Sequence, residues 1–206
     1  MSAGVVLYVS GGIPKTSDHA ATFSWSPDEL DVVRRHLAPL KPTILSPALR
    51  GDDLRDPYAT FGRDVLQIKI SDAVLVDARS KRGIGVGSEM LLAKTLGIPV
   101  VSITPPDSHY RRKDLTFLGQ QLDEWMHPFV AALSDFVAAD INEAAAWLLR
   151  SLKDRRARIK GPELIDEAID HYLRTQLRQD GAMLAFLQSH PKLVKSEIAK
   201  AGRQAA

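Results

Sequence analysis

The chain alternates short apolar runs with amphipathic runs, and this alternation most constrains its fold. The runs VVLYVS (5–10), AVLVDA (73–78) and IPVVSI (98–103) are rich in β-branched residues and lack a polar face, which is typical of buried strands. TILS (43–46) and DFVAAD (135–140) are further candidate strands. Strands separated by helices predict a parallel sheet that is covered by helices on both faces.

Amphipathic segments fill the gaps between these strands. Residues 26–29 (SPDE) form a capping-box pattern with proline at the first helical position, which predicts a helix ending near Pro39. Apolar residues recur at helical spacing over 58–68. Two more helices are expected over about 88–97 and 141–152.

The pattern divides the chain into two parts. Residues 1–152 carry all the strand signals and predict one α/β domain, in which 104–128 form a long polar connection. Residues 153–206 carry no strand signal. They open with a basic run and continue with two helical patterns, which break at Asp180-Gly181 and again at Pro191. This second part is interpreted as an α-helical extension, a candidate packing arm for a second subunit.

Composition excludes several classes of function. The 206 residues include no cysteine, which rules out disulfides, zinc–thiolate sites and thiol nucleophiles, and which fits a reducing compartment. The six histidines show no metal-ligand spacing, so neither a metal nor an organic cofactor is expected. No run reaches the ~18 apolar residues of a membrane span, and no signal-peptide pattern opens the chain. We therefore expect a cytoplasmic protein that does not bind membranes.

The sequence RGIGVGSEM (82–90) is expected to form a ligand-binding loop. Three glycines at alternate positions follow the 73–78 strand and lead to Glu89, where a helix is expected to begin. Ligands of open parallel sheets bind at the carboxyl ends of the strands, and glycines expose backbone N–H groups there. A carboxylate in the first helical turn suits a nucleophile, although glutamate is also common there as a cap. The glycine spacing matches neither a dinucleotide fingerprint nor a Walker motif.

Other polar side chains are expected near the same edge of the sheet. Asp77 lies inside an apolar strand, where an acid is costly unless it is paired, so a functional role is favoured. Asp64 lies on the helix that precedes this strand. Tyr8 stands two residues before the Ser10-Gly11-Gly12 turn. A strand tyrosine is more often a core residue, but its position beside a glycine turn favours a place in the site.

Together these residues resemble the nucleoside 2-deoxyribosyltransferase family and its relatives, the 2'-deoxynucleoside 5'-phosphate N-hydrolases. The resemblance rests on YVSGGI (8–13), RDVLQIKISDAVLVDA (63–78) and GIGVGSEMLLAKTLGIPVV (83–101), and it covers about residues 5–104. It implies a flavodoxin-like, Rossmann-like three-layer α/β fold with a mostly parallel five-stranded sheet. It also implies a homodimer or a larger assembly, in which neighbours complete each site.

The resemblance implies roles for individual residues as well. Glu89 would be the nucleophile that attacks the anomeric carbon, Asp64 would contact the base and protonate it as it leaves, and Tyr8 would orient Glu89. A carboxylate that stabilises an oxocarbenium-like state while a second group protonates the leaving group follows the logic of retaining glycosidases. The expected substrate-binding residues are Ser10, Gly11, Gly12, Ile13, Asp77, Gly85, Gly87 and Ser88.

One position favours the hydrolase over the transferase. Transferases that act on unphosphorylated nucleosides carry an aspartate six residues before the glutamate, where this chain has Gly83, which leaves room for a phosphate. Lys15, Lys81, Arg82 or the basic stretch 111–113 would supply positive charge. The expected function is therefore N-glycosidic cleavage of a (deoxy)nucleoside 5'-monophosphate. Base exchange between nucleosides is the alternative.

Three other functions compete with this one. A phosphoribohydrolase of the cytokinin-activating kind is less favoured, because its P-G-G-x-G-T-x-x-E pattern is missing. A non-catalytic nucleotide sensor would bind a nucleotide and pass a signal through the C-terminal extension. A nucleic-acid binder acting through 150–160 is disfavoured, because that basic run has no interleaved aromatics and the formal net charge is only +2.

Overall fold

A five-stranded parallel sheet forms the centre of the first of two compact units. The computed structural model describes residues 4–13, 25–154 and 159–192, and the units divide between Gly161 and Pro162. The strand order is β2-β1-β3-β4-β7, and every pair is parallel. The strands are β1 (Val6–Ser10), β2 (Thr43–Leu45), β3 (Ala73–Asp77), β4 (Val100–Ile103) and β7 (Phe136–Ala138).

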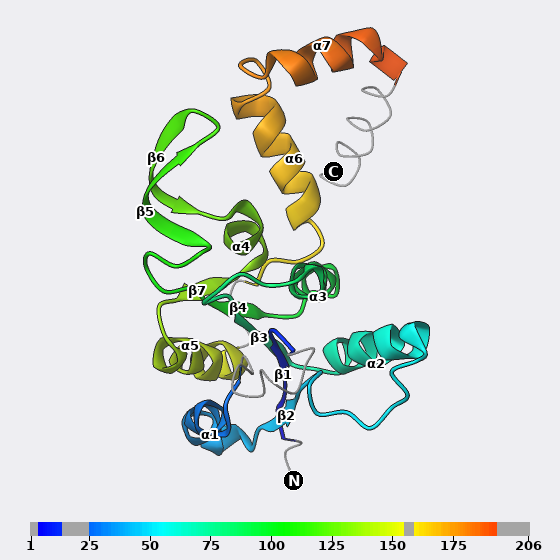
Figure 1. Ribbon diagram of the computed structural model, residues 1–206, viewed down its shortest axis with the longest axis vertical. Coiled ribbons are helices and arrows are strands. Elements are labelled where there is room, and N and C mark those ends of the chain that lie inside the picture. The colour runs from blue at the N-terminus through cyan, green and yellow to red at the C-terminus, as the bar shows by residue number, and fades with distance from the viewer. Residues whose placement is uncertain (1–3, 14–24, 155–158, 193–206) are drawn as a thin grey trace. The chain divides into compact units, whose positions relative to one another are not determined.

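Helices cover both faces of this sheet, which completes three layers (Figure 1). One face is covered by α1 (Pro27–His36) and α5 (Ile141–Lys153). The other is covered by α2 (Pro57–Lys69), α3 (Ile84–Thr95) and the short α4 (Pro128–Leu133). A 3-10 turn, η2 (Ala38–Leu40), follows α1. This strand order is the flavodoxin-like one, so the expected fold class is confirmed.

The alternation of side chains along each strand decides which of them can meet. Leu7, Val9 and Leu75 belong to the core that packs against α1 and α5. Tyr8 and Ser10 have the opposite parity and contact a side chain of α3. Successive strand residues point to opposite faces, so these two sets are separated by the sheet itself.

The start of α1 agrees with its sequence pattern. The Ser26 hydroxyl accepts a hydrogen bond from the Glu29 backbone N–H at 3.2 Å, and the Glu29 carboxylate accepts one from the Ser26 N–H at 2.9 Å. Both halves of the capping box are therefore present. The helix ends at His36, close to the predicted stop at Pro39.

Helix α3 begins earlier than the sequence suggests. Its N-cap is Gly83, so Gly85 and Gly87 lie inside the helix, and Glu89 lies in the second turn rather than the first. Glycine costs about 1 kcal/mol relative to alanine inside a helix, which is why the glycine run predicted a loop. Burial of Val86 and residues further along the same helix outweighs that cost.

A β-hairpin occupies most of the stretch that was expected to be an irregular connection. Strands β5 (Arg111–Phe117) and β6 (Gln120–Met126) pair antiparallel around a two-residue turn. Both turn residues, Leu118 and Gly119, have positive φ, as this kind of tight hairpin requires. The expectation was wrong because these strands are charged and largely exposed, so they lack the apolar alternation that marks a strand.

The second unit contains α6 (Leu164–Thr175) and α7 (Gly181–Ser189). Asp180 caps α7 by accepting a hydrogen bond from the Met183 N–H, and it also accepts one from the Tyr172 hydroxyl at 2.9 Å. The predicted break at Asp180-Gly181 is thus the start of a helix. Positions 155, 156 and 158 of the basic run lie outside the described residues. Within the described ranges, no helix is both long and apolar enough to cross a membrane.

Candidate active site

Two hydroxyl groups of β1 hold the carboxylate of Glu89. The Tyr8 hydroxyl donates a hydrogen bond of 2.9 Å to Oε1, and the Ser10 hydroxyl donates one to Oε2. Tyr8 and Ser10 are fully buried. They stand two residues apart on β1 and so share the face that is covered by α3. Each oxygen of Glu89 thus has its own donor.

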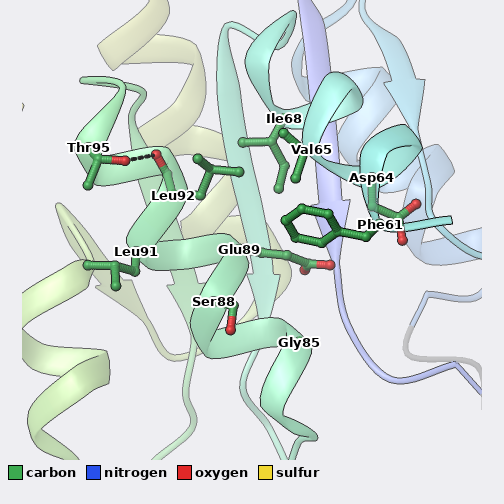
Figure 2. Close-up of a pocket in the computed structure, with 10 residues that line it drawn as sticks. All are labelled: Phe61, Asp64, Val65, Ile68, Gly85, Ser88, Glu89, Leu91, Leu92 and Thr95. Carbon is green, nitrogen blue, oxygen red and sulfur yellow. Dashed lines mark hydrogen bonds between the residues drawn. The ribbon is translucent and has the colours of Figure 1, made fainter. Parts of the chain in front are cut away.

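Glu89 lies on the wall of a pocket of about 570 Å³ between α2 and α3. Figure 2 shows its side chain directed from α3 toward α2, where the Phe61 ring and the Asp64 carboxylate lie. The remaining lining residues are Val65, Ile68, Gly85, Ser88, Leu91, Leu92 and Thr95. A mostly apolar pocket with two carboxylates at one end is typical of a small-molecule site.

Burial shapes the electrostatics of the pair formed by Glu89 and Tyr8. Burial raises the pKa of Glu89 above its ordinary value of 4.5, the hydrogen bonds from Ser10 and Tyr8 lower it, and the charge of Asp64 raises it. Burial and the neighbouring Glu89 raise the pKa of Tyr8 far above its ordinary 10.0. Tyr8 therefore stays a neutral phenol that donates its proton to the carboxylate.

Asp64 reaches the same pocket from α2, but guanidinium groups hold it. Arg50 Nη1 and Arg63 Nη1 each lie 3.3 Å from one of its oxygens. Arg50 also binds Asp52, through Nε at 2.8 Å and Nη2 at 2.7 Å. The loop between β2 and α2 is thereby joined to the helix that carries Asp64.

Asp77 does not line the pocket with Glu89. It is fully buried, it follows the parity of Leu75, and its carboxylate is bound by Arg79 at 2.9 Å and by Arg82 at 2.5 Å. Burial would raise the pKa of Asp77, but the hydrogen bonds from the two arginines outweigh it and hold the pKa below 3.8. Asp77 thus fastens the loop between β3 and α3.

The other predicted substrate-binding residues are distributed among three pockets. Gly85 and Ser88 share the pocket of Glu89. Gly11, Gly12 and Ile13 line a second pocket, of about 380 Å³, beside Trp25. Gly87 lines a third and smaller pocket together with Arg82, Tyr110 and His127. The turn after β1 and the glycines of α3 therefore line different pockets.

The expected sources of positive charge are only partly in place. Arg82 donates to the Asp77 carboxylate and to the Asp77 carbonyl oxygen, so its guanidinium is already used inside the protein. Lys15 lies outside the described residues. The first turn of α3 offers another anion-binding group, because α3 begins at Gly83 without a side-chain cap. Its first N–H groups have no partner within the helix, and they attract anions.

Sequence reasoning missed Trp25 and Arg79. The indole Nε1 of Trp25 donates a 3.0 Å hydrogen bond to the Ser10 carbonyl oxygen. The Arg79 guanidinium lies 5.5 Å from the centroid of the Trp25 ring, and it also pairs with Glu29. A tryptophan just before a capping box was a detectable signal, but nothing in the sequence linked it to β1.

No group of three or more histidine, cysteine, aspartate or glutamate side chains suited to a metal ion occurs within 4–13, 25–154 and 159–192.

The fold and the pocket together define a flavodoxin-like α/β protein with a pocket at one face of its sheet. A 2-desoxiribosyltransferase from Leishmania mexicana has this fold, with a TM-score of 0.50 and 14% sequence identity. The match covers 71% of this chain and 98% of that chain. No protein-family model matches the chain, and neither does any curated protein. The likeness to the transferase establishes a shared fold.

Proposed function

We propose that this chain cleaves the N-glycosidic bond of a (deoxy)nucleoside 5'-monophosphate, with Glu89 as the nucleophile. The observation that carries the proposal is the Glu89 carboxylate, bound by Tyr8 and Ser10 and facing a pocket that also contains Asp64. The shared fold with a 2-desoxiribosyltransferase supports the same kind of chemistry.

The reaction assigns one task to each of three side chains. Glu89 attacks C1' of the sugar, either as a covalent nucleophile or by stabilising the oxocarbenium-like state. Tyr8 keeps the attacking carboxylate oriented through its hydroxyl. Asp64, across the pocket, contacts the base and assists its departure. Water then releases the sugar phosphate, while a second base in place of water would give transfer.

The first turn of α3 supports a phosphorylated substrate. Gly83 and Gly85 have open space where a Cβ would stand, and Gly85 lines the pocket of Glu89. Uncapped N–H groups at this helix start favour a 5'-phosphate. The hydrolase is therefore preferred to the transferase, which is the second candidate.

A nucleotide panel tests this function. Ribo- and deoxyribonucleoside monophosphates, and the matching nucleosides, are incubated with the protein, and the release of base is followed with and without an added acceptor base. We expect release from monophosphates without an acceptor. Exchange of base on nucleosides with no hydrolysis of monophosphates would identify the transferase instead. Binding without release, unaltered in Glu89→Gln, would favour the non-catalytic sensor.

We also propose that two copies of the chain associate. Tyr58 and Phe61, which lie one turn apart on α2, are exposed large apolar side chains, and Ile84 at the start of α3 is exposed to 92%. Apolar groups that cluster in this way mark protein contacts more often than bare surface. Light scattering after gel filtration should give twice the 22.7 kDa of one chain, and a single-chain mass would contradict the proposal.

A further inference from the structure

Glu89 has a second support besides Tyr8. We propose that Ser10, held from behind by Trp25, is a positioning residue that sets the orientation of the Glu89 carboxylate. This inference rests on the function proposed above for Glu89. It replaces the expected role of Ser10, which the sequence assigned to substrate binding.

The geometry at Glu89 requires two donors to fix one carboxylate. Terminal carboxylate torsions are broad, so a single hydrogen bond leaves the group able to rotate. Tyr8 binds one oxygen and Ser10 binds the other, and both donors come from the same rigid strand. Removal of the Ser10 hydroxyl would leave Oε2 without the donor that now holds it.

Trp25 restrains the backbone that carries this hydroxyl. Ser10 is the last residue of β1, and two glycines follow it, which favour many backbone conformations. The 3.0 Å hydrogen bond from Trp25 Nε1 to the Ser10 carbonyl oxygen ties the end of the strand to the start of α1. The indole thus binds the same residue whose hydroxyl binds Glu89.

Arg79 in turn holds the Trp25 ring. Its guanidinium lies over the indole, and it is fixed on either side by Asp77 and Glu29. A guanidinium over an indole face is attractive through the ring quadrupole. Asp77 therefore lies on the opposite face of the sheet from Glu89 and still contributes to the support of Ser10.

The Ser10 hydroxyl also affects the charge of Glu89. Its hydrogen bond lowers the pKa of Glu89, against the rise that burial causes. A carboxylate must be ionised to act as a nucleophile. Loss of the hydroxyl should therefore reduce the ionised fraction most strongly at acidic pH, which a merely structural defect would not do.

The test compares pH–rate profiles of base release for wild type, Ser10→Ala and Trp25→Phe. Ser102→Ala is the matched control, because Ser102 is a fully buried strand serine whose hydroxyl bonds to Ser134 at 2.7 Å. We expect Ser10→Ala to lose rate at every pH, because the Glu89 carboxylate is less well oriented, and the loss should grow to about tenfold on the acidic side. Trp25→Phe should show a smaller loss of rate of the same kind, and Ser102→Ala should have the pH–rate profile of wild type. No loss in Ser10→Ala, or an equal loss in Ser102→Ala, would overturn the proposal.

A second measurement does not depend on activity. Carbon-13 labelling of glutamate carboxyl groups allows Glu89 to be titrated by NMR, with its signal identified by its absence in Glu89→Gln. The midpoint should move to higher pH in Ser10→Ala and stay in place in Ser102→Ala. An unchanged midpoint would defeat the role of Ser10 even if base release depends on Glu89. A moved midpoint in a protein that releases no base would defeat the proposed function alone.

Discussion

At the scale of single residues, Glu89 is a half-buried acid whose donors are neutral. Hydroxyl groups compensate a buried negative charge less fully than an arginine does, as the contrast with Asp77 shows. One carboxylate has its pKa raised and the other lowered, within one fold. A shifted pKa in a carboxylate that lies next to a pocket is typical of functional sites.

The raised pKa of Glu89 predicts a dependence of stability on pH. The folded state prefers the protonated form, so the stabilisation is complete below the ordinary value of 4.5 and is lost as pH rises through the higher folded value. Glutamine cannot ionise, so Glu89→Gln does not lose this stabilisation as the pH rises. Urea unfolding of both proteins from about pH 4 to pH 8 should show a growing advantage for the variant. Glu167→Gln, at an exposed position on α6, is the control. If the free energy of unfolding changed equally with pH in wild type and Glu89→Gln, the pKa of Glu89 would not be raised in the folded state.

Gly85 is predicted to lower the stability of α3 while it keeps the pocket of Glu89 open to a ligand. A Cβ at this position meets no atom within 4 Å, and the residue is helical, so Gly85→Ala should stabilise the protein by up to ~1 kcal/mol. The added methyl group enters the pocket of Glu89, so base release should fall about tenfold.

The control for this change is Gly62→Ala, on α2. Gly62 also has open space at its Cβ, but it does not line the pocket. It should gain similar stability without losing activity. Equal activity in the two variants, measured alongside their thermal midpoints, would show that Gly85 does not border the substrate.

At the scale of elements, α3 carries Glu89 near its middle and a buried ion pair near its C-terminal end. Lys94 is 1% exposed and binds the Asp135 carboxylate and the Lys160 carbonyl oxygen. Asp135 also accepts the Val100 N–H at 2.7 Å. The sheet, α3 and the segment after α5 are thereby joined at one carboxylate.

Loss of Lys94 should therefore destabilise the unit strongly. Lys94→Met leaves the buried Asp135 without its cation, and breaking such a pair costs about 3–5 kcal/mol. Urea unfolding gives the value, with Lys69→Met on the exposed end of α2 as the control. If the two variants were equally stable, the pair would not hold α3 in place.

The elements also show what the sequence could predict. The five strands and the capping box of α1 were readable, because the central strands β1, β3 and β4 are buried on both faces and because capping leaves a local pattern. The start of α3 was not, because tertiary burial outweighed glycine propensity. Tyr8 and Glu89 were correctly expected close together. Alternation along β3 places Asp77 on the same face as Leu75, and the sequence could have predicted this. Only the register between β1 and β3 shows that Tyr8 and Ser10 lie on the other face.

At the scale of the whole molecule, the first unit extends past the boundary expected near residue 152. Lys160 explains this, since its backbone N–H donates to Asp135 at 2.7 Å and its ammonium donates to the carbonyl oxygens of Ala132 and Ser134. A single residue beyond α5 makes these contacts, and no local sequence pattern predicts them.

A pair of truncations tests this boundary. A chain of residues 1–161 keeps every Lys160 contact and should unfold cooperatively in urea. A chain of residues 1–154 loses these hydrogen bonds and should be less stable by about 3 kcal/mol. Equal stability of the two chains would show that Lys160 does not belong to the first unit.

The measurement that bears most directly on Glu89 is the rate of base release by Glu89→Gln relative to wild type. Far-ultraviolet circular dichroism on the same samples controls for folding, and Glu167→Gln controls for the change of charge. With a correctly folded variant, we expect a loss of at least ~10²-fold, because the nucleophile is missing. A rate close to that of wild type would contradict it.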